Sequence, residues 1–217
     1  MAKSKKLTRT GTGDPPSTTT APSPTPTPSF LADGHPLPRL IVFDLDYTLW
    51  PFYSDIHISP PIRLVPNVHP PTLADRNGEH FSLYPDAPHI LRVIASLPKT
   101  RLAVASKSPV GDLCREVLKQ LRLPPVGEGV SEKGQPKRTI EAFDAGLEIY
   151  EGTKLRHFEV LAKRTGIPYS QMLFFDDERP NLEVESVGVT MRLIRDGLTW
   201  EELEKGVLQW RGNQGIA

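Results

Sequence analysis

The chain has 217 residues and carries 26 basic and 26 acidic side chains, so its formal net charge at pH 7 is zero. A protein that holds nucleic acid by its phosphates needs a basic surface, so this balance argues against a nucleic-acid partner. The single cysteine, Cys114, excludes an internal disulfide and a cysteine-based zinc site. The longest apolar runs are far too short to span a bilayer, so no membrane partner is expected.

The first 36 residues are rich in Pro, Thr and Ser and offer almost nothing that could fill a core. Such a segment cannot bury enough apolar surface to offset the entropy that is lost on ordering. We therefore expect a disordered tail over residues 1–36 and one compact domain over residues 37–212. No apolar segment follows the basic N-terminus, and proline soon forbids an amphipathic helix, so we expect a cytoplasmic or nuclear protein.

Short apolar runs without alternation predict central strands of a parallel sheet, because such strands are covered on both faces. Three runs have this form and end abruptly in polar residues, and a fourth, weaker run is expected near the sheet edge: residues 40–43, 102–105, 172–175 and 189–194.

Helical segments are predicted between and after these strands, over residues 86–97, 109–121, 156–164 and from a capping box at 199–202. Ser108 is expected to be the N-cap of the second helix, with Pro109 at its first position. Gly166 supplies a C-terminal signal for the third. Strands that alternate with helices predict an α/β fold with a Rossmann-like, doubly wound parallel sheet.

Two stretches interrupt this alternation. Residues 51–84 are rich in Pro, His and Asn and are predicted to form a long loop or a small hairpin flap, which would serve as a minimal cap over the sheet edge. Residues 122–140 combine Gly and Pro with charged residues and are predicted to form a surface insertion. The first stretch is too short to hold a helical cap domain.

Polar side chains follow three of the predicted strands, and in an open parallel sheet ligands bind at that edge. They are Asp44 and Asp46, then Ser106 and Lys107, then Asp176 and Asp177. Four carboxylates in one small volume repel one another and need a hard cation. Mg²⁺ suits oxygen ligands and keeps coordination positions for water and a substrate phosphate, so it is the expected cofactor.

This set of residues is suited to phosphoryl transfer. Asp44 can attack phosphorus, and Asp46 can protonate the leaving oxygen and later activate water. Thr48 could hydrogen-bond to Asp46 and orient it, while Ser106 offers a hydroxyl to a phosphate oxygen. Lys154 lies at the start of a predicted helix, where a cation gains nothing from the helix dipole, so we expect it to bind the phosphate or the aspartate pair.

These residues resemble the four motifs of haloacid dehalogenase phosphatases, namely DxDxT at residues 44–48, Ser106, Lys154 and the acidic pair at residues 176 and 177. The strings DLDYTLWPF, GTKLRHFE, GIPYSQM and FFDDER are similar to the magnesium-dependent phosphatase-1 subfamily in particular. The resemblance runs from about residue 40 to about residue 206, with residues 122–140 as the main departure.

The resemblance implies a role for each motif residue. Asp44 would be the nucleophile and a Mg²⁺ ligand, and Asp46 the acid/base and a ligand through its main-chain carbonyl. Asp177 would be the third protein ligand, with Asp176 nearby and acting through water. Substrate phosphate would be bound by Ser106, Lys107 and Lys154. The implied activity is hydrolysis of phosphomonoesters through an aspartyl phosphate, with protein phosphotyrosine or a small phosphosugar as the substrate.

Three other classes of protein were weighed. A phosphorylation-dependent receiver domain carries its phosphorylated aspartate on a later strand, and a haloalkanoic acid dehalogenase has no need for Asp46 or Mg²⁺. A non-catalytic module that binds Mg²⁺ and phosphate on the same fold is the main alternative. Such a module would be expected to lack one of the carboxylates, and all four are present.

Overall fold

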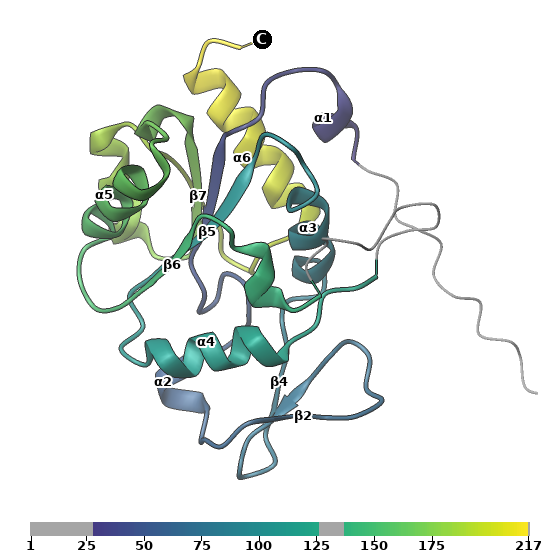
Figure 1. Ribbon diagram of the computed structural model, residues 1–217. Helices are drawn as coiled ribbons and strands as arrows, with labels where there is room; N and C mark the ends of the chain where they lie inside the picture. The colour runs from purple at the N-terminus through teal and green to yellow at the C-terminus, as the bar shows by residue number, and fades with distance from the viewer. Residues whose placement is uncertain (1–27, 126–136, 217) are drawn as a thin grey trace, which may run out of the picture.

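The computed structural model describes residues 28–125 and 137–216, in which five parallel strands form a central sheet (Figure 1). The strand order is β6-β5-β1-β7-β8. In chain order the strands are β1 (Leu40–Phe43), β5 (Arg101–Ser106), β6 (Gly146–Ile149), β7 (Met172–Asp176) and β8 (Thr190–Leu193). The three predicted central strands are therefore neighbours, and the weaker fourth run forms an edge strand as expected.

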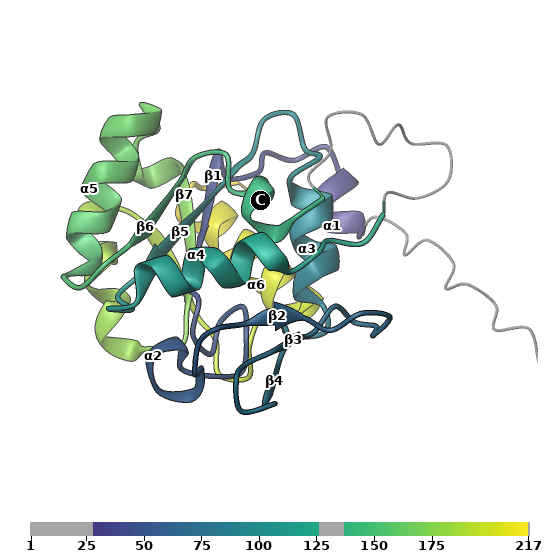
Figure 2. The same ribbon diagram turned by 60° about the horizontal axis from the view of Figure 1, so that its bottom comes forward.

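Helices cover both faces of this sheet (Figure 2). One face carries α3 (Ala87–Ile94), α4 (Gly111–Gln120) and α6 (Trp200–Asn213), and the other carries α5 (Lys154–Thr165) and the 3₁₀ helix η3 (Arg179–Val187). Shorter pieces are α1 (Ser29–Ala32), α2 (Ser54–His57), η1 (Thr139–Ala142) and η2 (Tyr169–Gln171). Within the described ranges, no helix is long and apolar enough to cross a membrane.

Successive residues of the central strand β1 enter two different apolar clusters. Ile41 and Phe43 pack with α3, α4 and α6, whereas Leu40 and Val42 pack with α5. A strand that is buried on both faces has a continuous apolar sequence, which is the pattern that predicted it. The α/β fold with a Rossmann-like, doubly wound parallel sheet is confirmed.

The strand β6 was not predicted from the sequence. It is short, it lies at the sheet edge beside β5, and its first two residues are only partly buried. Its first residue, Gly146, has a φ of +136°. An edge strand of this kind lacks the long apolar run that marks a central strand, so the sequence pattern is weak there.

The start of α4 differs from the prediction. The helix begins at Gly111 and not at Pro109. Ser108 is not the N-cap residue, and its hydroxyl oxygen instead accepts from the backbone N–H of Val110 at 3.4 Å, just before the helix. The same hydroxyl lies 2.8 Å from the hydroxyl of Ser54, in a segment far away in the chain. Ser108 therefore makes both a local and a tertiary contact ahead of the helix.

The caps of the other two long helices agree with their sequences, although α5 starts two residues before the predicted residue 156. Thr153 caps α5, which starts at Lys154, and Gly166 ends it in the left-handed conformation. Thr199 caps α6 by accepting a hydrogen bond from the backbone N–H of Glu202 at 3.1 Å. The cap places Lys154 on the first turn of α5, which matters for the site.

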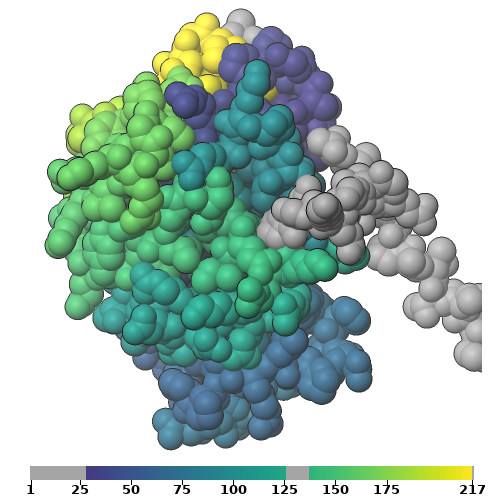
Figure 3. All heavy atoms as spheres, viewed as in Figure 1, coloured from purple at the N-terminus to yellow at the C-terminus, as the bar shows by residue number. Residues whose placement is uncertain are grey.

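The segment 51–84 contains α2 and a small antiparallel sheet of β2 (Arg63–Leu64), β3 (Leu73–Ala74) and β4 (His80–Phe81), in the order β2-β3-β4. It lies at one end of the molecule, below α4 in the view of Figures 1 and 3. Phe52 and Phe81 are buried and their rings meet edge to face with centroids 5.0 Å apart. These aromatic residues join the segment to the main core.

The tail predicted over residues 1–36 is ordered in its last part, while residues 1–27 lie outside the described residues. Phe30 of α1 is buried. The guanidinium of Arg211 donates to both carboxylate oxygens of Asp33, at 2.6 and 3.0 Å, and to the carbonyl of Pro36 at 3.0 Å. One aromatic residue and one ion pair thus hold a stretch whose composition alone indicated disorder.

The insertion predicted over residues 122–140 is described only at its ends, because residues 126–136 lie outside the described residues. Leu123 is buried, and its backbone N–H donates to the carbonyl of Lys137 at 3.0 Å. Arg122 and Arg138 form an isolated antiparallel bridge. Both ends of the segment are therefore held against the domain.

Arg211→Met is expected to lower the free energy of unfolding by about 1–3 kcal/mol, because the buried carbonyl of Phe30 loses its charged donor and α1 loses its link to α6. Urea unfolding followed by circular dichroism measures the difference. Arg195→Met is the control, since Arg195 is exposed. Equal midpoints for Arg211→Met and the wild-type chain would contradict the assignment of Arg211 as the anchor of this segment.

Candidate active site

The carboxyl ends of β5, β1 and β7 bring the predicted site residues together. Asp44 follows β1 directly, and its backbone N–H donates to the carbonyl of Phe175 on β7 at 3.0 Å. Phe43 is in register with Val104 on one side and with Phe175 on the other. The polar residues that end these adjacent strands consequently share one edge of the sheet, as the strand pattern predicted.

Lys154 is fully buried at the centre of this edge. Its ammonium lies 2.6 Å from Oδ1 of Asp44 and 2.9 Å from Oδ2 of Asp176, and it donates to the carbonyl of Ala105 at 2.6 Å. Burial disfavours the charged ammonium, but the charges of the two carboxylates outweigh it and raise the pKa of Lys154. A buried cation therefore links the ends of all three strands.

Asp44 is buried in the same cluster. Burial raises the pKa of its carboxyl group well above the usual range, and the negative charges of Asp176 and Asp46 raise it further. The ammonium of Lys154 acts in the opposite direction. The carboxyl group of Asp44 is thus in an environment that disfavours its charge unless a cation is present.

The two adjacent acidic residues at the end of β7 have different surroundings. Asp176 is fully buried, and its oxygens accept hydrogen bonds from Asn181 Nδ2 at 2.9 and 2.8 Å and from the N–H of Glu178 at 2.7 Å. Asp177 is only partly buried, and burial together with the charge of Asp176 raises its pKa to about 6. Protein donors therefore occupy Asp176, and Asp177 is the more accessible carboxylate.

Three donors hold the carboxylate of Asp46. Trp50 Nε1 donates to Oδ1 at 2.7 Å, and the backbone N–H and hydroxyl of Ser54 both donate to Oδ2 at 3.1 Å. Burial raises the pKa of Asp46, and these hydrogen bonds act against that rise. Neither Trp50 nor Ser54 was recognised from the sequence as a partner of Asp46.

The predicted hydrogen bond from Thr48 to Asp46 is absent, and this prediction is wrong. The hydroxyl of Thr48 is buried and has no hydrogen-bond partner among the described residues. The chain turns sharply here, because Tyr47 has a φ of +54° and the N–H of Thr48 donates to the carbonyl of Leu45 at 3.1 Å. That turn directs Thr48 into the core, and Trp50 takes the place beside Asp46.

The residues after β5 form the opposite side of the site. Ser106 is buried, and its hydroxyl oxygen accepts a hydrogen bond from the N–H of Ser108 at 3.2 Å, so its own proton remains available for a ligand. Lys107 forms a partly exposed ion pair with Glu178 at 2.9 Å. Such a surface pair contributes little stability, so Lys107 can leave it for a phosphate.

Comparison with known proteins matches residues 36–213 to a family described as Acid Phosphatase. The chain belongs to this family. It is similar to human "Magnesium-dependent phosphatase 1", at 38% identity over 79% of this chain and 86% of the relative. It is also similar to a haloacid dehalogenase-like hydrolase of Schizosaccharomyces pombe, at 36% identity over 70% of this chain and 83% of that protein.

A putative magnesium-dependent phosphatase of Saccharomyces cerevisiae shares 30% identity over 76% of this chain and 92% of that protein. Among solved structures, a phosphatase domain of Bacteroides fragilis complexed with Mg gives a TM-score of 0.46 at 14% identity, over 85% of this chain and 42% of that chain. The sequence matches confirm the predicted magnesium-dependent phosphatase subfamily and, with it, the prediction of an enzyme of the phosphatase class.

In this family member, the site carries more negative than positive charge. The carboxylates of Asp44, Asp46, Asp176, Asp177 and Glu178 face only two lysines. Within the described ranges, no three His, Cys, Asp or Glu side chains are grouped as a ready metal cluster. The contacts explain this, since the carboxylates of two of the acids are already bound by protein donors.

The remaining donors are hard oxygens, which fit Mg²⁺. They are the carboxylates of Asp44 and Asp177, because the carboxylates of Asp46 and Asp176 accept hydrogen bonds on both of their oxygens. Excess negative charge and oxygen donors both favour a divalent cation at this edge.

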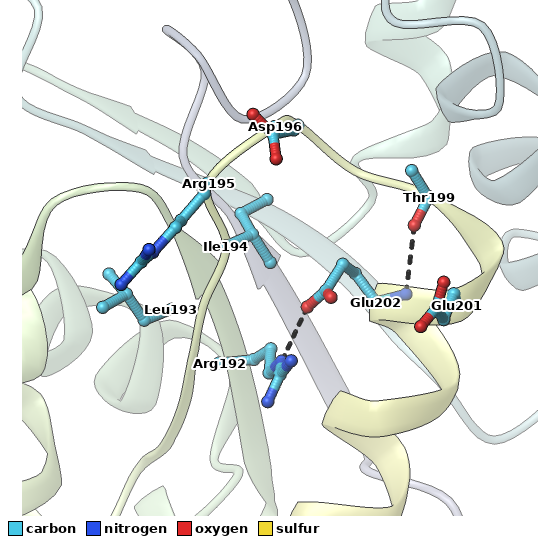
Figure 4. Close-up of a pocket in the computed structure, with 9 residues that line it drawn as sticks. Arg192, Leu193, Ile194, Arg195, Asp196, Thr199, Glu201 and Glu202 are labelled. Carbon is cyan, nitrogen blue, oxygen red and sulfur yellow. Dashed lines mark hydrogen bonds and ion pairs between the residues drawn. The ribbon is translucent and has the colours of Figure 1, made fainter.

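A pocket of about 360 Å³ lies elsewhere, between the end of β8 and the start of α6 (Figure 4). It is lined by Arg192 and Glu202, which form an ion pair at 2.7 Å, and by other residues between positions 192 and 202. None of the predicted catalytic, metal or phosphate-binding residues lines it. The pocket shares none of these side chains with the site, but it adjoins it, because the N–H of Ile194 in its lining donates to the carbonyl of Asp176 at 3.0 Å.

Proposed function

We propose that the chain is a Mg²⁺-dependent phosphomonoester hydrolase that forms an aspartyl phosphate on Asp44. The observation that carries this proposal is the ammonium of Lys154, 2.6 Å from Asp44 and 2.9 Å from Asp176 at the carboxyl ends of adjacent strands. A buried carboxylate with a cation beside it combines a nucleophile with charge that can stabilise a transferred phosphoryl group.

The first step uses Asp44 and Asp46. Because Oδ1 of Asp44 accepts from Lys154, Oδ2 is the oxygen that attacks phosphorus. The bond between phosphorus and the leaving oxygen breaks, and Asp46 donates a proton to that oxygen. The products of this step are the released alcohol and an acyl phosphate on Asp44.

The second step returns the protein to its starting state. Asp46, now ionised, takes a proton from a water molecule, and the resulting hydroxide attacks phosphorus. The bond between phosphorus and the Asp44 oxygen breaks, which releases inorganic phosphate and restores the carboxylate. Hydrogen bonds from Trp50 and Ser54 stabilise Asp46 in the ionised form that this step needs.

The transferred phosphoryl group needs donors that match its growing charge. Lys154 supplies a buried ammonium, and the hydroxyl of Ser106 keeps a free proton. Lys107 reaches the same edge from its exposed pair with Glu178. Mg²⁺, held by Asp44, Asp177 and the carbonyl of Asp46, would stabilise negative charge on the phosphoryl oxygens.

The substrates that we propose are protein phosphotyrosine and small phosphosugars. The segment 51–84 holds only the short helix α2 and three two-residue strands, and we expect such a small cap to leave the sheet edge open to a bulky group. Tyr53 is exposed on this segment, and its ring meets that of Tyr47 edge to face with centroids 4.7 Å apart. Aromatic rings of this kind give a planar or sugar-like group a surface to pack on.

Hydrolysis of p-nitrophenyl phosphate tests the proposal, measured with Mg²⁺ and with EDTA. We expect turnover that requires Mg²⁺ and returns when Mg²⁺ is added back to the EDTA-treated protein. Folded protein that binds Mg²⁺ and phosphate by calorimetry without turning over any phosphomonoester would instead support the non-catalytic binding module.

The affinity for Mg²⁺ should fall as the pH is lowered through about 6. The pKa of Asp177 is raised to about 6, so this carboxyl group is ionised above that pH and protonated below it. Since only the ionised form binds metal, we expect roughly a tenfold rise in Kd per pH unit below that value. Calorimetric titration at about pH 5 and about pH 7 measures this.

Asp177→Asn is the matched variant for this titration. It should bind Mg²⁺ more weakly than the wild-type chain at neutral pH and lose the part of the pH dependence that belongs to Asp177. The part that belongs to Asp44, whose pKa burial raises to about 8, should remain. A wild-type affinity that stays constant across the range would mean that Asp177 is not a ligand.

A further inference from the structure

The hydroxyl of Ser54 connects the carboxylate of Asp46 to a second buried serine. Ser54 is fully buried at the first position of α2, and its N–H and hydroxyl both lie 3.1 Å from Oδ2 of Asp46. Its oxygen also lies 2.8 Å from the hydroxyl of Ser108. Since the Ser54 proton is donated to the carboxylate, the bond between the two serines uses the proton of Ser108.

Ser108 in turn belongs to the loop that carries the phosphate-binding residues. Its N–H donates to the hydroxyl oxygen of Ser106 at 3.2 Å. The thiol of Cys114 on α4 lies 3.3 Å from the Ser54 hydroxyl and 3.4 Å from that of Ser108, so both oxygens have buried neighbours on the helix. A chain of hydrogen bonds thus runs from Ser106 through Ser108 and Ser54 to Asp46.

We propose that Ser54 is a positioning residue for Asp46, and that Ser108 holds Ser54 in place. This inference rests on the proposed function, in which Asp46 protonates the leaving oxygen. Ser54 belongs to the capping segment and Ser108 to the β5 loop, so the contact fixes Asp46 relative to the residues that bind phosphate. Ser54 thus has the role that was predicted for Thr48, which is to hydrogen-bond to Asp46 and orient it.

Position matters here because proton transfer requires the acid to lie within hydrogen-bond reach of the leaving oxygen. The indole of Trp50 fixes only Oδ1, and the carboxylate could still rotate about that bond. Two donors from Ser54 on Oδ2 prevent the rotation. Without the hydroxyl, only the backbone N–H remains on that oxygen, and Asp46 samples more orientations.

The test is Ser54→Ala, measured as kcat/KM over a series of phosphomonoesters whose leaving groups span a wide pKa range. Good leaving groups such as p-nitrophenolate depart without help, whereas alkoxides need a proton. We expect kcat/KM to fall by about 10-fold or more for an alkyl phosphate and by less than about threefold for p-nitrophenyl phosphate. The plot of log kcat/KM against leaving-group pKa should therefore be steeper than for the wild-type chain.

Three variants make this slope interpretable. Asp46→Asn gives the slope without a proton donor, and Ser54→Ala should lie between it and the wild-type slope. Ser108→Ala should change the slope in the same direction by a smaller amount. Thr100→Val removes another buried hydroxyl, which donates to the carbonyl of Pro38 at 2.9 Å away from the site, and it should leave the slope unchanged.

A uniform fall of kcat/KM for every substrate, with a slope equal to that of the wild-type chain, would overturn the inference and leave Ser54 with a structural role. If Ser54→Ala does not fold, Ser108→Ala decides by the same criterion. The proposed function fails separately, because it requires wild-type turnover that depends on Mg²⁺ and on Asp44, whatever the slope of the Ser54 variant.

Discussion

Asp44→Asn should lower kcat for p-nitrophenyl phosphate by about 10⁴-fold or more, because it removes the oxygen nucleophile and leaves the binding groups in place. Steady-state kinetics with saturating Mg²⁺ measures the loss. Incubation of the wild-type chain with substrate followed by rapid acid quench should trap a phosphorylated protein, and the Asn variant should show none.

The variant is expected to remain folded. The amide has the shape of the carboxyl group, and Lys154 keeps its ion pair with Asp176 at 2.9 Å, so the loss of free energy of unfolding should be smaller than for Lys154→Met. Asp55→Asn is the matched control, because Asp55 is exposed on α2 and should leave kcat unchanged. Full activity in Asp44→Asn would place the nucleophile elsewhere.

Lys154→Met should lower both activity and stability. The free energy of unfolding should fall by about 3–5 kcal/mol, because two buried carboxylates lose the cation between them. The same substitution removes positive charge from the transferred phosphoryl group, so kcat/KM should fall by about 10²–10³-fold. Urea unfolding and steady-state kinetics measure the two effects.

The stability deficit of Lys154→Met should shrink as the pH is lowered. Burial already raises the pKa of Asp44 above its value in the unfolded chain, and loss of the ammonium raises it further. The folded variant then takes up a proton that the unfolded chain does not, which relieves the repulsion as the pH falls. Lys205→Met, at an exposed pair with Glu201, is the control and should change neither quantity.

Sequence patterns predict the position of the candidate site residues where these adjoin the strands that carry them. The apolar run of β1 is followed at once by Asp44, and the run of β7 ends in Asp176. A strand that is buried on both faces has a continuous apolar sequence, which makes it recognisable. Polar residues that directly follow such a strand lie at the edge of the sheet where ligands bind.

Sequence patterns do not reveal hydrogen-bond partners that are far apart in the chain. Ser54 and Ser108 are 54 positions apart, and nothing in the pattern around either residue indicates the other. Thr48 was assigned to Asp46 because the two are close in sequence, yet the left-handed turn at Tyr47 directs Thr48 into the core. Sequence proximity is a poor guide to side-chain direction at a sharp turn.

A long-range contact also explains the N-terminal segment, for which composition indicated disorder up to residue 36. Arg211, 178 positions from Asp33, orders residues that have little core of their own. The sequence by itself determined four of the five strands of the central sheet, the approximate positions of the long helices and the candidate chemistry, because apolar periodicity and polar strand ends are local properties. Only the tertiary structure decided the contacts of Lys154 with the two aspartates, of Ser108 with Ser54, and of Arg211 with the first helix, because those contacts join segments that meet only in the folded chain.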